Sequence, residues 1–183
     1  MCTSIILFRK KNLWPVIIGS NRDERLDRKS LFPGRNWKKK YPNIVGGKDL
    51  EKQGSWIGVN DFGITAIIHN RKLDKKLVEK KNSRGIIILE TLKHSSIKKS
   101  LKYISSIDKN NYNSFNLLVA NYNECYWIKN DINVDNLVIK KLNYGTKSSS
   151  LIGLPNKKKN DQNIVFKTTN SFPVIDTYLD VIF

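Results

Sequence analysis

The chain begins Met1-Cys2-Thr3-Ser4-Ile5-Ile6-Leu7-Phe8, and Val16-Ile17-Ile18-Gly19-Ser20 then leads into Asn21-Arg22-Asp23-Glu24. Two apolar runs of this length, separated by the polar Arg9-Lys10-Lys11-Asn12, predict two antiparallel strands joined by a hairpin. Antiparallel pairing brings the start of the first strand beside the end of the second. We therefore expect Cys2 to lie next to the polar tetrad at residues 21–24.

Cys2 is the candidate nucleophile. Initiator methionine is usually removed before a small residue, which would give Cys2 a free α-amine able to act as base for the adjacent thiol. A cation such as Arg22 favours the thiolate, and Asp23 would orient the ammonium group. Neighbouring strand residues face opposite ways, which leaves open whether Arg22 points at Cys2. A structural interpretation also stays open, in which Cys2 is a small buried residue and the tetrad is an ion-paired turn.

A second hairpin is predicted further along the chain. Ser55–Asn60 alternates apolar and polar residues, Asp61-Phe62-Gly63 turns the chain, and Ile64–Asn70 is apolar enough to be buried on both faces. The carboxamide of Asn70 either supports an oxyanion or caps the strand end through its own side chain. His69 faces the other side of this strand, so we expect it to be structural or exposed.

Two helices are predicted in the middle of the chain. Ser83 is the expected N-cap of a helix from Arg84 to about Lys93, and a second helix begins after Ser95 or Ser96. Apolar residues fall on one face of the second helix at helical spacing, namely Ile97, Leu101, Ile104 and Ile107. We expect this helix to cover a sheet.

The remaining strands place the chain in the α+β class. They are predicted at Ser114–Tyr122, Cys125–Ile128, Leu137–Leu142, Leu151–Leu154 and Asn163–Thr168. The Pro-, Gly- and Lys-rich stretch between the two hairpins is predicted as a loop, with Gly46-Gly47 as a turn. Strands followed by helices and then strands favour antiparallel sheets with segregated helices.

Composition predicts a single cytoplasmic domain over residues 1–183. The chain is 39% hydrophobic, contains no apolar run long enough to span a membrane, and shows no signal-peptide pattern. Its two cysteines form no disulfide framework and belong to no Cys/His cluster, so neither a metal nor another cofactor is expected. The oligomeric state is not indicated.

The net charge of +17 raises the question of nucleic-acid binding. The lysine runs at 38–40, 75–76 and 157–159 lie in predicted loops and carry no interleaved aromatic residues. They therefore lack a stacking platform for bases. We expect no specific nucleic-acid partner, and a small-molecule substrate or ligand instead.

The sequence resembles the NRDE family, named for the tetrad, which is the family of transport-and-Golgi-organisation homologues. The similarity starts with Met1-Cys2 and Asn21-Arg22-Asp23-Glu24, and continues through Gly46-Gly47-Lys48-Asp49-Leu50, Gly54-Ser55-Trp56-Ile57-Gly58, Gly63, Asn70 and Phe115-Asn116-Leu117. The resemblance implies an N-terminal-nucleophile hydrolase fold, an αββα sandwich of antiparallel sheets with helices outside. It implies Cys2, Asp23 and Asn70 as catalytic residues, with Asn21 and Arg22 binding the substrate.

Longer members of this family carry a mostly helical insert after the strand that resembles Cys125–Ile128, and this chain lacks it. We therefore expect a reduced helical layer and an exposed apolar sheet face. The implied activity is hydrolysis of a non-peptide C–N amide bond. The resemblance also implies an alternative, a non-catalytic carrier or trafficking protein for haem or a lipid-like small ligand.

Overall fold

The computed structural model of the chain describes residues 2–71, 82–130, 144–155, 163–169 and 179–181. Its strands are β1 (Thr3–Phe8), β2 (Val16–Arg25), β3 (Ser30–Gly34), β4 (Ile44–Asp49), β5 (Ile57–Asn60), β6 (Thr65–Asn70), β7 (Phe115–Ala120), β8 (Cys125–Asn130), β9 (Tyr144–Leu154), β10 (Val165–Thr169) and β11 (Leu179–Asp180). Its helices are α1 (Gly85–Leu92) and α2 (Ile97–Ser106), followed by a short 3-10 helix at Lys109–Asn111.

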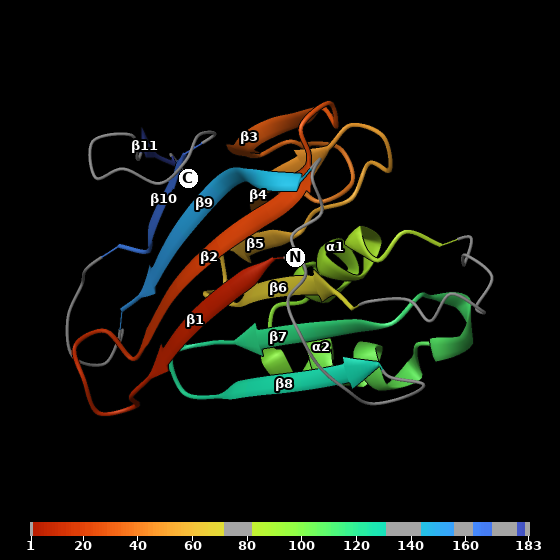
Figure 1. Cartoon of the computed structure of the whole chain (residues 1–183). Helices are drawn as coiled ribbons and strands as arrows, with labels where there is room; N and C mark the ends of the chain where they lie inside the picture. The colour runs from red at the N-terminus through yellow and green to blue at the C-terminus, as the bar shows by residue number, and fades with distance from the viewer. Residues whose placement is uncertain (1, 72–81, 131–143, 156–162, 170–178, 182–183) are drawn as a thin grey trace.

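The described strands form two sheets, both with antiparallel pairing (Figure 1). We call the sheet with strand order β1-β2-β9-β10-β11 the outer sheet. The inner sheet has the order β3-β4-β5-β6-β7-β8 and lies between the outer sheet and the helices. The predicted α+β arrangement of antiparallel sheets is confirmed.

The N-terminal hairpin forms as predicted. β1 pairs with β2 from Thr3 opposite Asn21 to Phe8 opposite Val16. Even-numbered residues of β2 are buried from Val16 to Arg22, because side chains of a strand point to opposite faces in turn. β2 continues to Arg25, so the tetrad lies within a strand and does not form a turn.

Two apolar cores hold the layers together. Between the sheets, side chains of the outer sheet (Val16, Ile18, Ile152, Leu154, Phe166) pack on side chains of the inner sheet (Val45, Ile57, Val59, Ile67, Leu118). On the other face of the inner sheet, Ile44, Ala66, Ile68, Leu117 and Val119 pack on Ile87, Ile88 and Leu92 of α1. Full burial of one such large side chain stabilises the fold by about 1.5–3 kcal/mol. The inner sheet is therefore buried on both faces.

The helices begin for different reasons. Ser96 caps α2 by accepting a hydrogen bond from the Lys99 backbone N–H, and the helix begins directly after it, which is one of the two predicted starts. The prediction that Ser83 caps the first helix is wrong, because Arg84 occupies the N-cap position and makes no side-chain capping bond. The start of α1 is instead fixed by backbone packing, since a Cβ on Gly54 would lie 2.5 Å from the carbonyl carbon of Gly85. Neither described helix is long and apolar enough to cross a bilayer.

The stretch predicted as a loop contains β3 and β4, and Gly46-Gly47 lies inside β4 where a turn was expected. A Cβ on Gly46 would lie 2.8 Å from the Ile57 carbonyl oxygen, and a Cβ on Gly47 would lie 2.4 Å from the Trp56 ring. Both glycines therefore permit close packing within the sheet. The strand predicted at Leu137–Leu142 lies outside the described residues.

In the described part of the chain, no helix packs on the far face of the outer sheet. Ile5, Leu7 and Ile17 are exposed on this face, with Leu7 opposite Ile17 in the pairing register. The predicted apolar sheet face is thus present. Within the described residues the layers are outer sheet, inner sheet and helices, and the helices of this part of the chain pack on the inner sheet.

Candidate functional site

The hairpin brings the Cys2 thiol to the tetrad. Thr3 lies opposite Asn21, so the residue before Thr3 lies beside the end of β2. The Cys2 Sγ donates a hydrogen bond of 3.9 Å to the backbone carbonyl of Asp23. Burial raises the pKa of the Cys2 thiol, and the Asp23 carbonyl and the charge of Arg22 offset only part of that rise. The thiol therefore needs a base before it can react as a thiolate.

Arg22 is the buried cation of the site. It lies on the side of β2 that faces the inner sheet and is only 5% exposed. Its Nη2 lies 3.2 Å from the Asp49 carboxylate, and its guanidinium carbon lies 4.2 Å from the centre of the Trp56 ring. Its Nη1 is buried with no hydrogen-bond partner among the described residues. Burial lowers the pKa of Arg22, and the carboxylate of Asp49 opposes that change.

Asp49, at the end of β4, organises this wall. Its Oδ2 forms ion pairs with Arg22 and with Arg28, whose Nε lies 2.7 Å away. Its Oδ1 accepts the backbone N–H groups of Glu51 and Lys52 at 3.0 and 2.8 Å. One carboxylate thus connects two cations to the following loop. Because these charge-assisted hydrogen bonds share one carboxylate, they hold the two guanidinium groups and the loop in fixed positions.

Trp56 takes its position from the glycine in the neighbouring strand. The ring occupies the space where a Gly47 side chain would be. The Ser55 hydroxyl lies 2.8 Å from the carbonyl oxygens of both Gly47 and Ile57, which fixes the backbone next to the ring. Gly47 therefore allows Trp56 to lie against the guanidinium of Arg22.

The opposite wall comes from the end of β6 and the start of α1. Asn70 is exposed at the last position of β6, and its carboxamide makes no hydrogen bond to any described residue. Arg84 precedes α1 and donates through Nη1 to the Ser114 carbonyl at 2.8 Å. The Ser55 backbone N–H donates to the Gly85 carbonyl at 3.0 Å, which ties this wall to the other.

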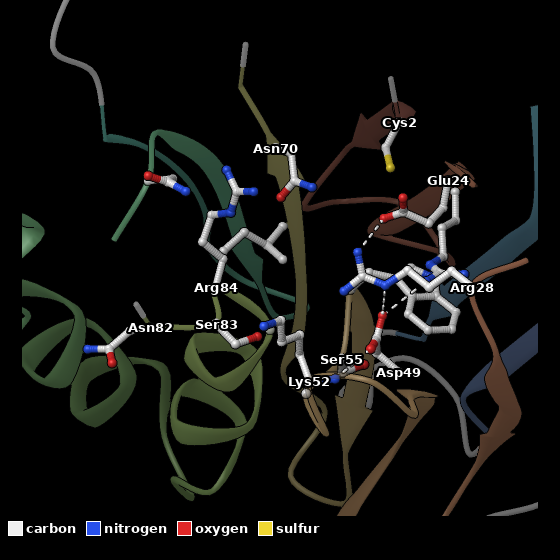
Figure 2. A pocket seen from close by; sticks show the side chains of 16 residues that line it. Cys2, Glu24, Arg28, Asp49, Lys52, Ser55, Asn70, Asn82, Ser83 and Arg84 are labelled. Atoms are coloured by element: carbon white, nitrogen blue, oxygen red, sulfur yellow. Dashed lines mark hydrogen bonds and ion pairs between the residues drawn. The ribbon is translucent and has the colours of Figure 1, made fainter. Parts of the chain in front are cut away.

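The two walls enclose a cleft of about 160 Å³ (Figure 2). It is lined by Cys2, Arg22, Glu24, Arg28, Asp49, Lys52, Gly54, Ser55, Trp56, Ile68, Asn70, Asn82, Ser83, Arg84, Gly85 and Asn113. Figure 2 shows Cys2 and Asn70 at one end of the cleft and Lys52 extending toward Ser83 at the other. The lining is dominated by charged and amide side chains, so it suits a polar ligand.

The structure brings three of the five sequence-predicted site residues to this cleft, namely Cys2, Arg22 and Asn70. Asn21 and Asp23 are not among its lining residues, because alternation along β2 turns Arg22 and Glu24 toward it instead. The roles of all five sequence-predicted residues stay predictions.

His69 contacts the Ser4 hydroxyl through Nε2 at 2.8 Å and does not line the cleft. The described residues hold no group of three His, Cys, Asp or Glu side chains placed for a metal ion.

Sequence reasoning missed Asp49, Trp56 and Arg28. Asp49 and Trp56 lie in the motifs Gly46-Gly47-Lys48-Asp49 and Gly54-Ser55-Trp56. These motifs carry the family resemblance, but in sequence alone they assign no role to each residue. Their function depends on contacts between residues far apart in the chain, such as Arg22 with Asp49.

Comparison with known proteins gives one similarity in structure and one in sequence. The solved structure of penicillin V acylase from Agrobacterium tumefaciens matches with a TM-score of 0.40 and 12% sequence identity, over 91% of this chain and 49% of that one. The chain therefore spans about half the length of that acylase. No curated protein matches the sequence.

The sequence match covers most of the chain. The family model described as Transport and Golgi organisation 2 matches residues 1–171, a range that contains every lining residue of the cleft. The chain belongs to the Transport and Golgi organisation 2 family.

Proposed function

We propose that this chain is an N-terminal-cysteine hydrolase of a non-peptide amide, with a fold of the αββα type in which one helical layer is reduced. The observation that carries the proposal is the convergence of Cys2, Arg22 and Asn70 on one cleft. Cys2 directly precedes β1, Arg22 lies in β2 and Asn70 ends β6, so only the folded chain brings them together. A thiol nucleophile and an amide donor for the oxyanion are groups that acyl transfer uses, and the charge of Arg22 favours the thiolate.

The first half of the reaction forms a thioester. After removal of Met1, the α-amine of Cys2 takes the thiol proton, and Sγ attacks the amide carbonyl carbon. The oxyanion that forms is stabilised by the Asn70 carboxamide and a backbone N–H group. The C–N bond then breaks, and the α-ammonium returns its proton to the leaving amine.

The second half repeats the steps with water. The α-amine takes a proton from water, and the resulting hydroxide attacks the thioester carbonyl carbon. The C–S bond then breaks to release a carboxylic acid, and the α-ammonium returns its proton to the Cys2 thiolate. Asp23 holds the ammonium group in place. Its charge is close enough to Cys2 to raise the pKa of the thiol, which supports this role.

The polar lining favours this function over the carrier alternative. A haem or lipid carrier needs a cleft with large apolar walls, and Trp56 and Ile68 are the large apolar side chains in this lining. Carriage of haem or a lipid-like ligand remains the alternative prediction, and it requires no free α-amine on Cys2.

The test is acylation of Cys2 by an activated amide or ester probe in the untagged protein. We expect one acyl group on Cys2, its loss in Cys2→Ser, and its retention in Cys125→Ser, since Cys125 starts β8 and does not line the cleft. Equal labelling of both cysteines, or labelling that survives Cys2→Ser, contradicts the proposal. A shift in the haem absorbance spectrum on mixing, together with absent acylation, supports the carrier.

A further inference from the structure

We propose that the far face of the outer sheet and the hairpin loop between β1 and β2 dock the protein onto the surface of an anionic lipid bilayer. We call these two parts together the docking surface. Its apolar members are Ile5, Leu7, Leu13 and Ile17, and its basic members are Arg9 and Lys10. None of these residues lines the cleft, so the inference does not rest on the chemistry proposed for Cys2.

The apolar part of the docking surface is contiguous. Leu7 lies directly opposite Ile17 in the register of β1 and β2, and Ile5 follows two residues away on the same face. Ile5 is 76% exposed, and Leu7 and Ile17 are 38% and 36% exposed. A Cβ on Gly19, the residue opposite Ile5, would meet nothing within 4 Å, so the space above the sheet is open there. Exposed large apolar side chains grouped in this way indicate a contact surface.

The hairpin loop extends this apolar part and adds positive charge to it. Leu13 is 48% exposed, and Trp14 is partly exposed and belongs to neither apolar core. Arg9 and Lys10 are exposed and form no ion pair with a carboxylate of the described residues. The Lys10 ammonium lies 6.0 Å from the centre of the Phe8 ring. Aromatic and basic side chains of this kind suit the headgroup region of a bilayer, where rings are half-solvated and cations meet lipid phosphates.

The charge of this region has one sign, which distinguishes it from the rest of a basic chain. The first acidic residue of the sequence is Asp23, so no carboxylate side chain within residues 1–22 opposes the loop, which also contains Lys11. Charges on α1 are mixed by comparison, since Lys93 there pairs with Glu90. In Figure 1 the hairpin loop forms one end of the outer sheet, away from both helices. Apolar and basic side chains therefore coincide at this end of the molecule.

This combination selects the partner. A second copy of the chain would bring its own charge of +17 to the surface, and like charges oppose that contact. A nucleic acid would match the positive charge, but it would set a phosphate backbone against the aliphatic side chains of Ile5 and Ile17. An anionic bilayer matches both parts, because its headgroups attract the loop and its acyl boundary accepts the apolar side chains.

The test is co-sedimentation of the untagged protein with large unilamellar vesicles. One set of vesicles contains equal parts of phosphatidylserine and phosphatidylcholine, and the other contains phosphatidylcholine alone. We expect binding to the anionic vesicles to be about tenfold tighter than to the neutral ones, because each basic residue at an anionic surface adds to the affinity. Binding should weaken as salt rises.

Charge variants locate the contact. The double variant Arg9→Gln/Lys10→Gln should weaken binding about ten- to thirtyfold, since each basic residue near an anionic membrane contributes about fivefold. The matched control is Lys98→Gln/Lys99→Gln, which removes the same charge from exposed positions on α2. We expect the control to bind nearly as tightly as the native chain.

Apolar variants test the second part of the surface. The double variant Ile5→Ser/Leu13→Ser removes the two most exposed apolar side chains and should weaken binding about tenfold. Its matched control is Leu26→Ser/Leu31→Ser, at positions 67% and 43% exposed in β3 and the loop before it, and it should bind like the native chain. All four positions are exposed, so thermal unfolding followed by circular dichroism should show that each variant is folded.

Three results would overturn the inference: equal binding to anionic and neutral vesicles, no binding to either, or equal loss in a test variant and its matched control. Equal loss in the two charge variants would mean attraction to the overall charge of +17. A dimer that Ile5→Ser/Leu13→Ser dissociates, with no vesicle binding, would assign the surface to a second copy instead. Cys2→Ser should bind vesicles as the native chain does, so failure of the proposed function leaves this test unaffected.

Discussion

Gly47→Ala tests whether Trp56 holds Arg22 in place. The new Cβ would lie 2.4 Å from two carbon atoms of the Trp56 ring, whereas ordinary contacts begin near 3.4 Å. The ring must therefore move by about 1 Å, and it cannot keep its place over the Arg22 guanidinium 4.2 Å away. Overpacking of this kind costs about 1–3 kcal/mol, and loss of the cation–π contact costs about 0.5–2 kcal/mol.

We expect Gly47→Ala to lower the free energy of unfolding by about 2–3 kcal/mol, which corresponds to a Tm lower by roughly 5–10 °C. Thermal unfolding followed by circular dichroism measures this directly. Gly19→Ala is the control, because a Cβ on Gly19 meets nothing within 4 Å and the variant should be unchanged or slightly more stable.

A double-mutant cycle sharpens the test. In a Trp56→Leu background the space beside residue 47 is open, so the additional Gly47→Ala change should cost much less than it does alone. Equal cost in both backgrounds, or equal stability of Gly47→Ala and Gly19→Ala, would refute the packing argument.

Three further outcomes are expected. Asp49→Asn leaves the buried Arg22 and the partly buried Arg28 without their carboxylate and should destabilise the fold by about 3–5 kcal/mol in urea denaturation. Asp61→Asn breaks a half-exposed pair and should cost under about 1 kcal/mol, so similar losses in the two variants would contradict the network. Burial lowers the pKa of His69 below 6.5, so the unfolded chain takes up the proton first and stability should fall as pH drops below about 6.5. His69→Gln should reduce the loss of stability between pH 7.5 and pH 5. An unchanged pH dependence in this variant would mean that another group causes the loss. Burial raises the pKa of the Cys2 thiol, so its alkylation by iodoacetamide in a Cys125→Ser protein should still accelerate above pH 9, and a plateau near pH 7 would contradict this.

Local patterns predicted the parts of the fold that depend on neighbours in sequence. The N-terminal hairpin follows from two apolar runs around a polar turn, and the strand ending at Asn70 follows from its continuous apolar character. The start of α2 follows to within one residue from Ser95-Ser96 before a helical apolar stripe. In each case the residues that decide the structure lie within one turn or one strand of each other.

The missed features depend on contacts between distant residues. Gly46-Gly47 is a turn signal in isolation, yet in β4 these glycines make room for Trp56 and for Ile57 of β5. The start of α1 was misplaced for the same reason, since packing of Gly85 on Gly54 decides it.

The candidate site was predicted in part. Antiparallel pairing placed Cys2 beside the tetrad, but alternation along β2 decides which tetrad members enter the cleft, and it selects Arg22 and Glu24. The partner of Arg22 is Asp49, 27 residues later on another sheet, and no local pattern connects them.

The most direct test of the account is the intact mass of the untagged protein, measured before and after an acyl probe is added. The account predicts a mass short of one methionine residue and a gain of one acyl group that maps to Cys2. A full-length mass with Met1 retained, and no acyl group on Cys2, would contradict it, because the α-amine would then be held in a peptide bond and could not serve as the base.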